Sequence, residues 1–428
     1  MTNTAPIVVV GGGIAGLIAA RVLAAVPAAP PVLLFEAAPQ LGGRVHTRRV
    51  AGYTLDAGFQ VLFEGYPTLR SHLDLAALEM RWFVPGARIV DADGTVRTMG
   101  DALADPALLW PSLTQGAMAW PDLLRLLSLR QFARSLDDAA CFAPPYCAIS
   151  TLDFLRERGF SSRAIARFFA PFYGGILLDR SLASSASVLL FTLRMLGSGR
   201  TGVPAHGMGA VATQLASALA PSQIRTSTVV RAITAEQGRA TGVVLTDGSH
   251  TAASAVVLAT DAPTAVQLAA TAGVALALPI DGRAVRTFYF GTRTSCLRGR
   301  ALWLNADPAA VVSHAVTMSD VAAEYAPAGQ HLIAASTLGP DADEAGVRAD
   351  LVRMSGREFP GDGELLAVDA IPFAQFDQPP RATRLAISPT TALPGLVLAG
   401  EYLHSSSLEG AAIGGTRGAD AVLSYLAL

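Results

Sequence analysis

The stretch that decides the fold is PIVVVGGGIAGLIAARVL, residues 6–23. It begins with a β-branched run, Ile7 to Val10, which is typical of a buried parallel strand. The glycines that follow, Gly11, Gly13 and Gly16, have the spacing GxGxxG and lead into a helix-like run. In this motif the glycines permit a tight turn, let a pyrophosphate approach the backbone and let the helix pack on the strand. The motif therefore predicts phosphate binding at the helix N-terminus, where free N–H groups and the helix dipole favour anions.

The same stretch is apolar enough to raise two alternatives, an export signal and a membrane helix. An export signal needs a positively charged start, and residues 1–4 carry no basic side chain. A membrane helix needs about 20 apolar residues, whereas Arg21 interrupts this run and its glycines weaken a helix. We therefore favour the phosphate-binding loop and expect a cytoplasmic protein.

A second strand and an acidic residue follow in the order that dinucleotide binding requires. The run from Val32 to Phe35 reads as a buried strand, and Glu36 follows it about 20 residues after Gly16. An acid at this place accepts hydrogen bonds from ribose hydroxyls. The alternative is a glycine-rich turn and an unrelated surface glutamate. Since strand, turn, helix, strand and acid all occur in order, we predict a dinucleotide site.

Three further stretches favour FAD over NAD. Residues 41–44, Leu-Gly-Gly-Arg, offer backbone to a phosphate and a guanidinium that can pair with it. Residues 225–260 read as strands with a hairpin turn at Asp247-Gly248. Residues 395–423 read as a strand, an acidic turn, a serine-rich loop and a helix that begins near Leu408. The N-terminus of that helix suits the negative charge that a flavin gains on reduction.

With these stretches in place, the chain resembles the superfamily of flavin amine oxidases, protoporphyrinogen oxidases and phytoene desaturases. The residues that carry the resemblance are Gly11 to Gly16, Glu36, Leu41 to Arg44, Asp56 to Gly58, Val230, Ile233, Glu401 and Glu409 to Ala411. Residues 168–186 and 203–211 are more similar to the desaturase and protoporphyrinogen-oxidase side of the superfamily.

The resemblance implies a bound FAD and a set of residues that contact it. Glu36 would contact the adenosine ribose, Arg44 the pyrophosphate and the backbone of Val230 the adenine. Glu401 would lie by the phosphate and ribityl chain, and Gly410-Ala411 by the isoalloxazine. The full predicted set is Gly11, Gly13, Ile14, Ala15, Gly16, Glu36, Ala37, Gly42, Gly43, Arg44, Gly58, Val230, Gly400, Glu401, Glu409, Gly410 and Ala411.

The resemblance also predicts an α/β fold with a discontinuous Rossmann-like FAD-binding domain of the GR2 type. Residues 1–70, 205–275 and 385–428 would form that domain. Residues 71–204 and 276–384 would form an inserted α+β substrate-binding domain, whose helical part covers about residues 100–200. Helical periodicity there and strand-like runs in 283–340 agree with this division.

Departures from the superfamily pattern bear on the substrate and on how the flavin is held. Amine oxidases of this superfamily typically hold a water near flavin N5 with a lysine, and all 32 basic residues of this chain are arginine. They also place an aromatic residue two positions before the Glu-Gly-Ala triplet, where this chain has Ser407. Members with covalent flavin use a cysteine near the last helix, and the nearest cysteine in sequence, Cys296, is remote from it. We therefore predict non-covalent FAD and argue against an amine substrate.

Composition excludes several other classes. The formal net charge of −2 argues against nucleic-acid binding. The 3 cysteines form neither a disulfide framework nor a zinc site, and the histidines show no ligand spacing, so no metal is predicted.

Two side chains and one helical stretch are weaker candidates for function. His404 lies in the loop before the predicted flavin-facing helix, where it would act on substrate or bond locally. Tyr173 would line the pocket or simply pack within the core. Residues 108–136 combine tryptophans, leucines and arginines as a membrane-surface helix does, but we favour a packed helical layer over the substrate pocket.

These observations predict an FAD-dependent oxidoreductase that moves a hydride from a C–H bond of an apolar substrate to flavin N5. A carotenoid-precursor-like polyene and a porphyrinogen-like ring are the expected substrate classes, with oxygen or a quinone as electron acceptor. No acid–base residue is assigned. A flavin amine oxidase is the first alternative. The second is a flavin-free binding protein, like the relatives of this fold that escort prenylated GTPases.

Overall fold

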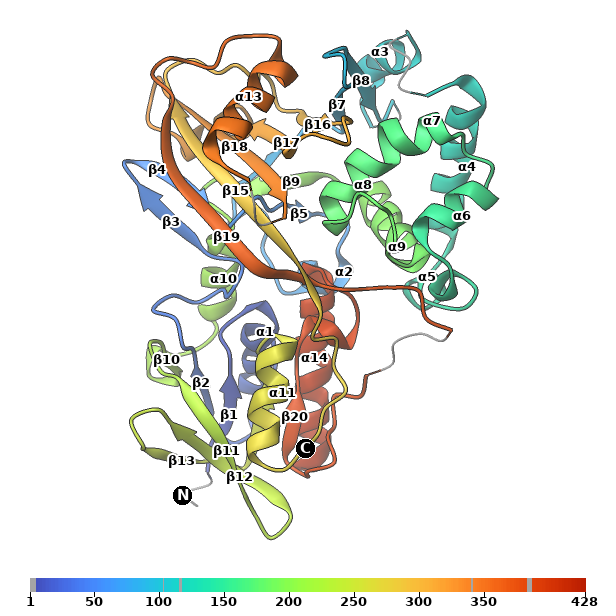
Figure 1. Cartoon of the computed structure of the whole chain (residues 1–428). Coiled ribbons are helices and arrows are strands. Elements are labelled where there is room, and N and C mark those ends of the chain that lie inside the picture. The colour runs from blue at the N-terminus through green and yellow to red at the C-terminus, as the bar shows by residue number, and fades with distance from the viewer. Residues whose placement is uncertain (1–4, 103, 115–117, 340–341, 383–386) are drawn as a thin grey trace.

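The structure is a computed structural model that describes residues 5–102, 104–114, 118–339, 342–382 and 387–428. Small parts of the ranges predicted for the two domains, and residues 115–117 of the predicted 108–136 stretch, lie outside the described residues. The chain forms a mixed α/β fold with one parallel sheet below, a larger sheet above and a group of helices beside the larger sheet (Figure 1).

The lower sheet is entirely parallel and has β1 at its centre. In spatial order its strands are β10 (Ile224–Arg225), β2 (Val32–Phe35), β1 (Ile7–Val10), β14 (Ala255–Leu258) and β20 (Leu396–Leu398). All four residues of β1 are buried, which explains its unbroken apolar run. The strands predicted at residues 7–10 and 32–35 are confirmed.

Both faces of this sheet are covered. On one face Ile7 and Val9 share a core with α1 (Ile14–Ala24) and α14 (Leu408–Tyr425), and these two helices pack against each other. On the other face Val8 and Val10 pack with α11 (Ala262–Thr271) and with β11 (Val230–Glu236) and β12 (Arg239–Leu245). Antiparallel β11, β12 and β13 (His250–Ala252) form a three-stranded sheet, and the predicted turn at Asp247-Gly248 joins the last two.

The upper sheet has seven strands and is mostly antiparallel. Its spatial order is β19 (Glu364–Phe376), β15 (Gly282–Thr292), β18 (His331–Leu338), β17 (Val312–Thr317), β16 (Leu302–Asn305), β7 (Gly86–Val90) and β8 (Val96–Gly100). One face packs on α13 (Glu344–Ser355). The other face lies over the segment that follows β4 (Tyr53–Asp56).

Two small sheets connect the lower and upper parts. One pairs β3 (Thr47–Val50) with β4, and the other pairs β9 (Thr201–Pro204) with both β5 (Leu62–Phe63) and β6 (Met80–Trp82). The second sheet therefore joins strands from both of the predicted domains. Short helices α2 (Pro67–Ser71), α10 (Gly209–Ala216) and α12 (Met318–Val321) complete these connections.

Helices beside the upper sheet occupy the region predicted to be helical. They are α3 (Leu109–Thr114), α4 (Trp120–Ser135), α5 (Asp138–Cys141), α6 (Thr151–Glu157), α7 (Ser162–Ala164), α8 (Ala170–Leu177) and α9 (Ala186–Gly197). α7 continues through a π-helical turn, Ile165–Phe169, into α8. In the described part of the chain, no helix is both long and apolar enough to cross a membrane.

The preferred interpretation of residues 108–136 as a packed layer is wrong in part. Leu129 and Ala133 of α4 are buried as expected. The opposite face of α4 and the start of α3 instead expose five large apolar side chains: Leu109 (50%), Trp110 (74%), Trp120 (62%), Leu124 (63%) and Leu127 (54%). The predicted helical periodicity is present in α4. It produces two apolar faces, one that is buried against the protein and one that is exposed to solvent.

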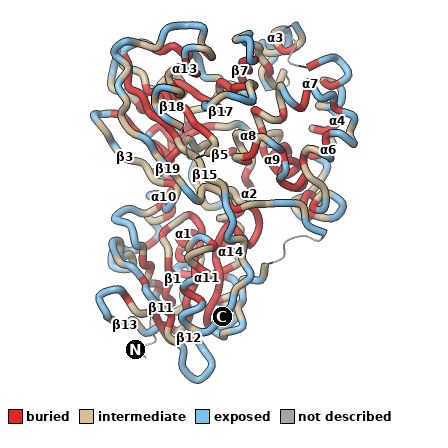
Figure 2. Tube along the Cα trace, viewed as in Figure 1, coloured by how far each residue is buried: buried red, intermediate tan, exposed pale blue. Residues whose placement is uncertain are grey.

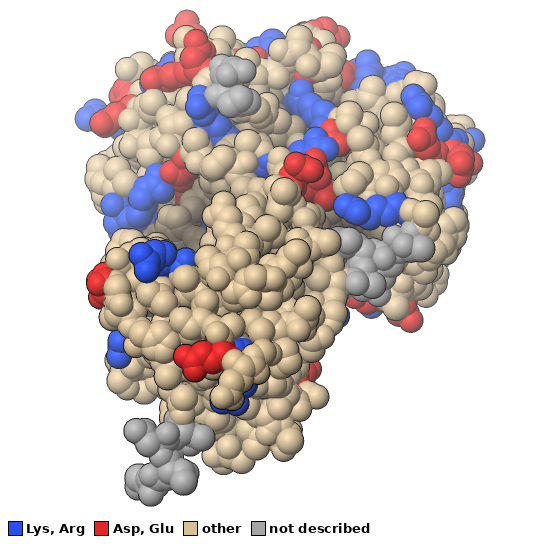
Figure 3. Space-filling model, turned by 60° about the horizontal axis from the view of Figure 1, so that its bottom comes forward, with Lys and Arg blue, Asp and Glu red and all other residues tan. Residues whose placement is uncertain are grey.

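Burial is greatest in the central strands of the two larger sheets. The strands β1, β14 and β17 and most of α1 are buried, whereas the loops at the outer ends are exposed (Figure 2). On the face that Figure 3 shows, described acidic and basic side chains form small groups of both signs, without a continuous basic patch.

Glu409 ties the lower helix α14 to the short helix α2. Its side chain is 1% exposed, and its carboxylate oxygens accept the N–H groups of Thr68 (2.8 Å) and Leu69 (2.9 Å) in the first turn of α2. A carboxylate at a helix N-terminus satisfies free donors and complements the helix dipole. The contact therefore explains why α2 forms at all, since five residues are too few for a stable isolated helix.

Replacing Glu409 with alanine should lower the melting temperature of the protein clearly. The change leaves two N–H groups without an acceptor, at a cost of about 1–3 kcal/mol each. Glu409→Gln keeps one acceptor oxygen and should lose less, and Glu157→Ala on the exposed end of α6 serves as the matched control. Thermal denaturation followed by circular dichroism measures all three. Equal melting temperatures for Glu409→Ala and the wild type would contradict this role.

Candidate flavin site

The site is built at the carboxyl edge of the parallel sheet, where all the strands end together. Backbone hydrogen bonds continue from strand to strand past this edge: Gly11 N donates to Phe35 O, Ala259 N to Val10 O and Ala399 N to Leu258 O, each at 2.8 Å. The segments that carry most of the predicted cofactor residues are thereby brought side by side. Ligands of open parallel sheets bind at this edge.

The glycine loop leaves open space where a phosphate is expected. A Cβ atom at Gly16 would lie 1.9 Å from the carbonyl oxygen of Gly11, so only glycine lets α1 approach β1 this closely. At Gly13 the nearest atom to an added Cβ is the carbonyl oxygen of Gly42, 4.0 Å away. Gly13 is the N-cap of α1, without a side-chain cap and without an acid in the first turn. This N-terminus, which includes Ile14 and Ala15, fits an anionic group.

The glycine pair Gly42-Gly43 packs against the glycine loop of residues 11–16. Gly42 N donates to Gly12 O at 2.8 Å, which brings Gly42 and Gly43 against the glycine loop. Glu36 receives the N–H groups of Gly12 (2.6 Å) and Ala38 (2.8 Å), so its carboxylate is fixed at the end of β2 beside Ala37. These contacts orient the acid toward the loop, as ribose recognition requires.

Val230 is brought near this acid by the backbone. Thr228 N donates to Glu36 O at 2.8 Å, and Val230 begins β11 two residues later. The structure therefore places the residue predicted to contact adenine beside the residue predicted to contact ribose.

Arg44 forms a partly buried ion pair with Glu401, whereas the resemblance implied that each residue makes its own contact with the cofactor. Its Nη2 lies 2.7 Å from Glu401 Oε1, and its Nη1 donates to Ala374 O at 2.7 Å. Burial lowers the pKa of Arg44, but the Glu401 carboxylate outweighs this effect and the pKa is raised. Burial raises the pKa of Glu401, against the opposing effect of Arg44. Asp261 adds negative charge near both groups and was missed by the sequence analysis.

The predicted residue Gly58 belongs to the segment that joins this edge to the upper sheet. Gly58 N donates to Asp369 Oδ2 (3.2 Å), and Phe59 N donates to Thr287 Oγ1 (3.3 Å). Arg48 binds the same Asp369 carboxylate through both guanidinium nitrogens, at 2.5 and 3.1 Å. The upper sheet therefore covers the Gly58-Phe59 backbone directly.

Gly400 lies two residues after the end of β20, and Gly410 and Ala411 lie in the first turn of α14. The Ser407 hydroxyl caps this helix by accepting Gly410 N at 2.9 Å. The Glu409 carboxylate, also predicted to contact the cofactor, is engaged by α2 instead. Only the backbone of Glu409 is therefore left to contact a cofactor.

His404 has local partners on both ring nitrogens. Nε2 lies 2.6 Å from Asp138 Oδ2, and Nδ1 lies 2.9 Å from Ser405 Oγ. The rings of Phe142 and Phe191 pack against the imidazole at centroid distances of 4.9 and 5.6 Å. This arrangement agrees with the local-bonding interpretation of His404.

Tyr173 is 1% exposed, and its ring stacks on Phe169 at 5.9 Å. Burial raises the pKa of its hydroxyl, which agrees with a packing role.

Asp56 is a second group that the sequence analysis did not single out as a site residue. It is 3% exposed, and its carboxylate accepts Thr47 Oγ1 (2.5 Å), Met208 N (2.8 Å) and Tyr325 OH (2.8 Å). Burial raises its pKa, and these three donors oppose the rise. Its place in the Asp-Ala-Gly triplet was the available signal. Among the described residues, no group of histidines, cysteines and acids is placed to hold a metal.

Replacing Gly13 with alanine should remove most of the flavin without unfolding the protein. The added methyl group meets no protein atom closer than 4.0 Å and would occupy the space expected for a phosphate. A loss of affinity of about tenfold or more follows if it costs about 1.4 kcal/mol of binding. The flavin absorbance of the purified protein and its melting temperature give the two readouts. Gly16→Ala is the contrasting variant and should destabilise the fold itself. A Gly13→Ala protein with full flavin content would contradict this site.

Comparisons with known proteins agree with this geometry. The profile described as flavin containing amine oxidoreductase matches residues 14–423. Coproporphyrinogen III oxidase of Propionibacterium freudenreichii is 29% identical over 175 residues, which span 40% of this chain and 31% of that protein.

Solved structures of similar fold include two with named activities. One, provisionally described as a protoporphyrinogen oxidase of Exiguobacterium sp. 255-15, is 19% identical with a TM-score of 0.72 and covers 100% of both chains. Cyclohexylamine oxidase of Brevibacterium oxydans is 17% identical with a TM-score of 0.69, covering 99% of this chain and 100% of that one. The chain therefore belongs to the flavin containing amine oxidoreductase family, whose members are flavin-dependent oxidoreductases.

Proposed function

We propose that this protein is an FAD-dependent oxidoreductase that removes a hydride from a C–H bond of an apolar substrate. The substrate is a polyene or a porphyrinogen-like ring rather than an amine. Support for the ring comes from the partial similarity to a coproporphyrinogen III oxidase.

One observation carries this proposal: among the described residues, the sheet face over Gly58 and Phe59 presents one carboxylate, Asp369, and that carboxylate is already paired with Arg48. Asp369, Thr287, Ser336 and His314 occupy one row across four neighbouring strands of this sheet. The carboxylate in this row, Asp369, is neutralised by the two-point contact with Arg48.

The nearby Asp56 carboxylate is equally unavailable, because it is buried and already accepts three hydrogen bonds. No lysine exists anywhere in the chain to hold a water beside the flavin. A protonated amine would therefore lose its hydration without gaining a counter-charge.

The chain contributes to the reaction by positioning the substrate, by excluding water and by stabilising negative charge on the reduced cofactor. Hydride acceptance is the chemistry that the flavin supplies when it is bound. The Gly58-Phe59 segment, fixed by Asp369 and Thr287, holds the floor of the pocket against the upper sheet. α14 directs its N-terminus toward the site, and this end of a helix favours the negative charge of a reduced cofactor.

The cofactor is FAD, held without a covalent bond. Glu36 and Val230 lie together where an adenosine ribose and adenine would bind, and this favours a dinucleotide over FMN. Cys141, Cys147 and Cys296 are all buried. Cys147 and His404 do line the same pocket, although they are far apart in the sequence. Acid precipitation of the protein should therefore release all the flavin as free FAD, also from a Cys147→Ala variant.

Anaerobic reduction of the bound flavin tests the proposed function. The flavin-loaded protein is mixed with a polyene in liposomes, with a porphyrinogen, or with primary and secondary amines, and the loss of flavin absorbance is followed. We expect bleaching by the polyene or the porphyrinogen and none by the amines, because the Asp369 and Asp56 carboxylates are already engaged by other groups of the protein. Bleaching by an amine alone would establish the amine-oxidase alternative. A protein that binds no flavin would support the escort alternative.

We further propose that the exposed apolar face of α3 and α4 contacts an anionic lipid bilayer. Trp110, Trp120 and Leu124 are exposed there, and α4 also carries the exposed residues Arg125 and Arg134, of which Arg125 contacts Asp122. Apolar and aromatic side chains bordered by basic ones are the composition that binds bilayer interfaces. Such contact suits an apolar substrate that is dissolved in lipid.

Replacing Trp110, Trp120 and Leu124 together with serine should lower vesicle binding about tenfold or more, because the apolar anchors are lost. Cosedimentation with phosphatidylcholine vesicles, with and without phosphatidylglycerol, measures the bound fraction. The matched control carries serine at Val229, Ile280 and Val368, which are exposed apolar residues elsewhere. Equal binding of both triple variants, or no binding of the wild type, would contradict the proposal.

A further inference from the structure

His314 is a buried imidazole whose ring nitrogens both lack a partner among the described residues. It lies on β17, is 5% exposed, and neither Nδ1 nor Nε2 has a hydrogen bond. Leaving a buried polar group unpaired costs about 1–3 kcal/mol, and folded proteins rarely keep one. A partner supplied by a bound molecule removes this cost.

The surroundings keep the imidazole neutral and confined. The Phe59 ring packs against it at a centroid distance of 5.1 Å. On another side Gly175 of α8 approaches so closely that a Cβ atom there would lie 3.2 Å from Nδ1. Burial, with a smaller effect of the positive charge on Arg180, lowers the pKa of His314 to about 4. A neutral imidazole offers one N–H donor and one nitrogen acceptor.

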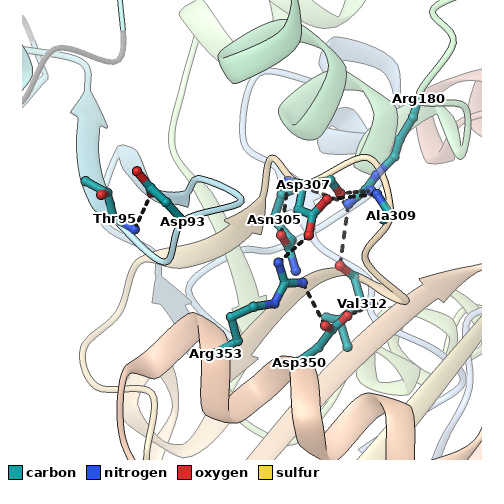
Figure 4. Close-up of polar contacts among 9 residues, drawn as sticks. All are labelled: Asp93, Thr95, Arg180, Asn305, Asp307, Ala309, Val312, Asp350 and Arg353. Atoms are coloured by element: carbon teal, nitrogen blue, oxygen red, sulfur yellow. Dashed lines mark hydrogen bonds and ion pairs between the residues drawn. The ribbon is translucent and has the colours of Figure 1, made fainter.

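A network of hydrogen bonds and ion pairs anchors the end of β16, the connection to β17 and the first residue of β17 (Figure 4). Arg180 donates to the carbonyl oxygens of Asp307 (3.0 Å) and Asn305 (2.8 Å) in the connection between β16 and β17. Arg353 pairs with Asp307 and with Asp350 (2.7 Å). The second Asp350 oxygen accepts the N–H of Val312, two residues before His314, at 2.8 Å. The beginning of the strand that carries His314 is therefore held in place by this network.

His314 also belongs to the row that covers the candidate site. It pairs in register with Ser336, which contacts Thr287, and Thr287 accepts the N–H of Phe59. On the same face, one row along, a small crevice is lined by residues that include Gly58, Phe59 and Tyr289. Phe59 therefore both lines the crevice and covers the imidazole.

We propose that His314 is a substrate-binding residue that hydrogen-bonds a polar group on a ring substrate once the Phe59 ring turns aside. The proposal rests on the proposed function and narrows its substrate class. A pyrrole N–H of a porphyrinogen-like ring can donate to the free imidazole nitrogen, whereas a hydrocarbon polyene has no polar group to pair with it. The polyene would leave His314 buried and unpaired, so the ring is the favoured substrate.

Porphyrin binding by His314 variants tests this proposal independently of catalysis. Coproporphyrin III is titrated into the flavin-loaded wild type and into His314→Leu, and the shift of its absorption gives the affinity. We expect His314→Leu to bind the porphyrin about tenfold more weakly, since one buried hydrogen bond is lost. Its melting temperature should stay equal or rise, because removing an unpaired polar group from the core is not destabilising.

Two further variants keep the test decisive. His314→Asn retains a donor and an acceptor and should recover part of the affinity, also if the leucine variant folds poorly. His250→Leu, on the exposed strand β13, is the matched control and should bind as the wild type does.

The result that overturns the proposal is unchanged porphyrin affinity in both His314 variants, or an equal loss of affinity for a polyene. Failure of the proposed function has a different signature, which is the absence of anaerobic flavin reduction in the wild type by either apolar substrate.

Discussion

The contact between Gly16 of α1 and the carbonyl oxygen of Gly11 is the constraint on which the rest of the site depends. It brings the helix against the fully buried central strand of the parallel sheet, so that the uncapped helix N-terminus opens at the carboxyl edge. The segments after the neighbouring strands then line up along this edge through the hydrogen bonds that continue past β1, β2 and β14. Side chains as distant in sequence as Arg44 and Glu401 meet there for this reason.

The upper sheet matters to function because it is joined to this edge through few, well-defined polar contacts. The backbone of Gly58 and Phe59 donates to side chains of β19 and β15, and Arg48 neutralises the acid that receives one of these bonds. The Gly58-Phe59 segment therefore lies directly under a sheet face on which Arg48 balances the charge of Asp369. Under the proposed function, this balance favours apolar molecules with neutral polar groups over cations.

The sequence was sufficient for the parts of the fold that depend on local pattern. The strands at residues 7–10 and 32–35, the glycine loop and the hairpin at Asp247-Gly248 all carry signals within a few residues. Contacts between remote segments carry no such signal. The pairing of Arg44 with Glu401 and the use of the Glu409 carboxylate by α2 depend on how distant elements pack. The role of His314 could not be predicted for the same reason, since only the packed structure shows that its ring nitrogens lack hydrogen-bond partners. The outward stripe on α4 was misjudged because helical periodicity does not say which of two apolar faces is buried.

The central claim is that a hydride leaves a C–H bond of a ring-shaped apolar substrate and passes to a flavin held at the carboxyl edge. Single-turnover anaerobic reduction with a porphyrinogen deuterated at its bridging carbons tests this claim most directly. The account predicts that flavin reduction occurs and is clearly slower with the deuterated than with the unlabelled ring, because the bond to that hydrogen breaks in the step observed. Reduction at the same rate with both rings, or reduction only by an amine, would contradict it.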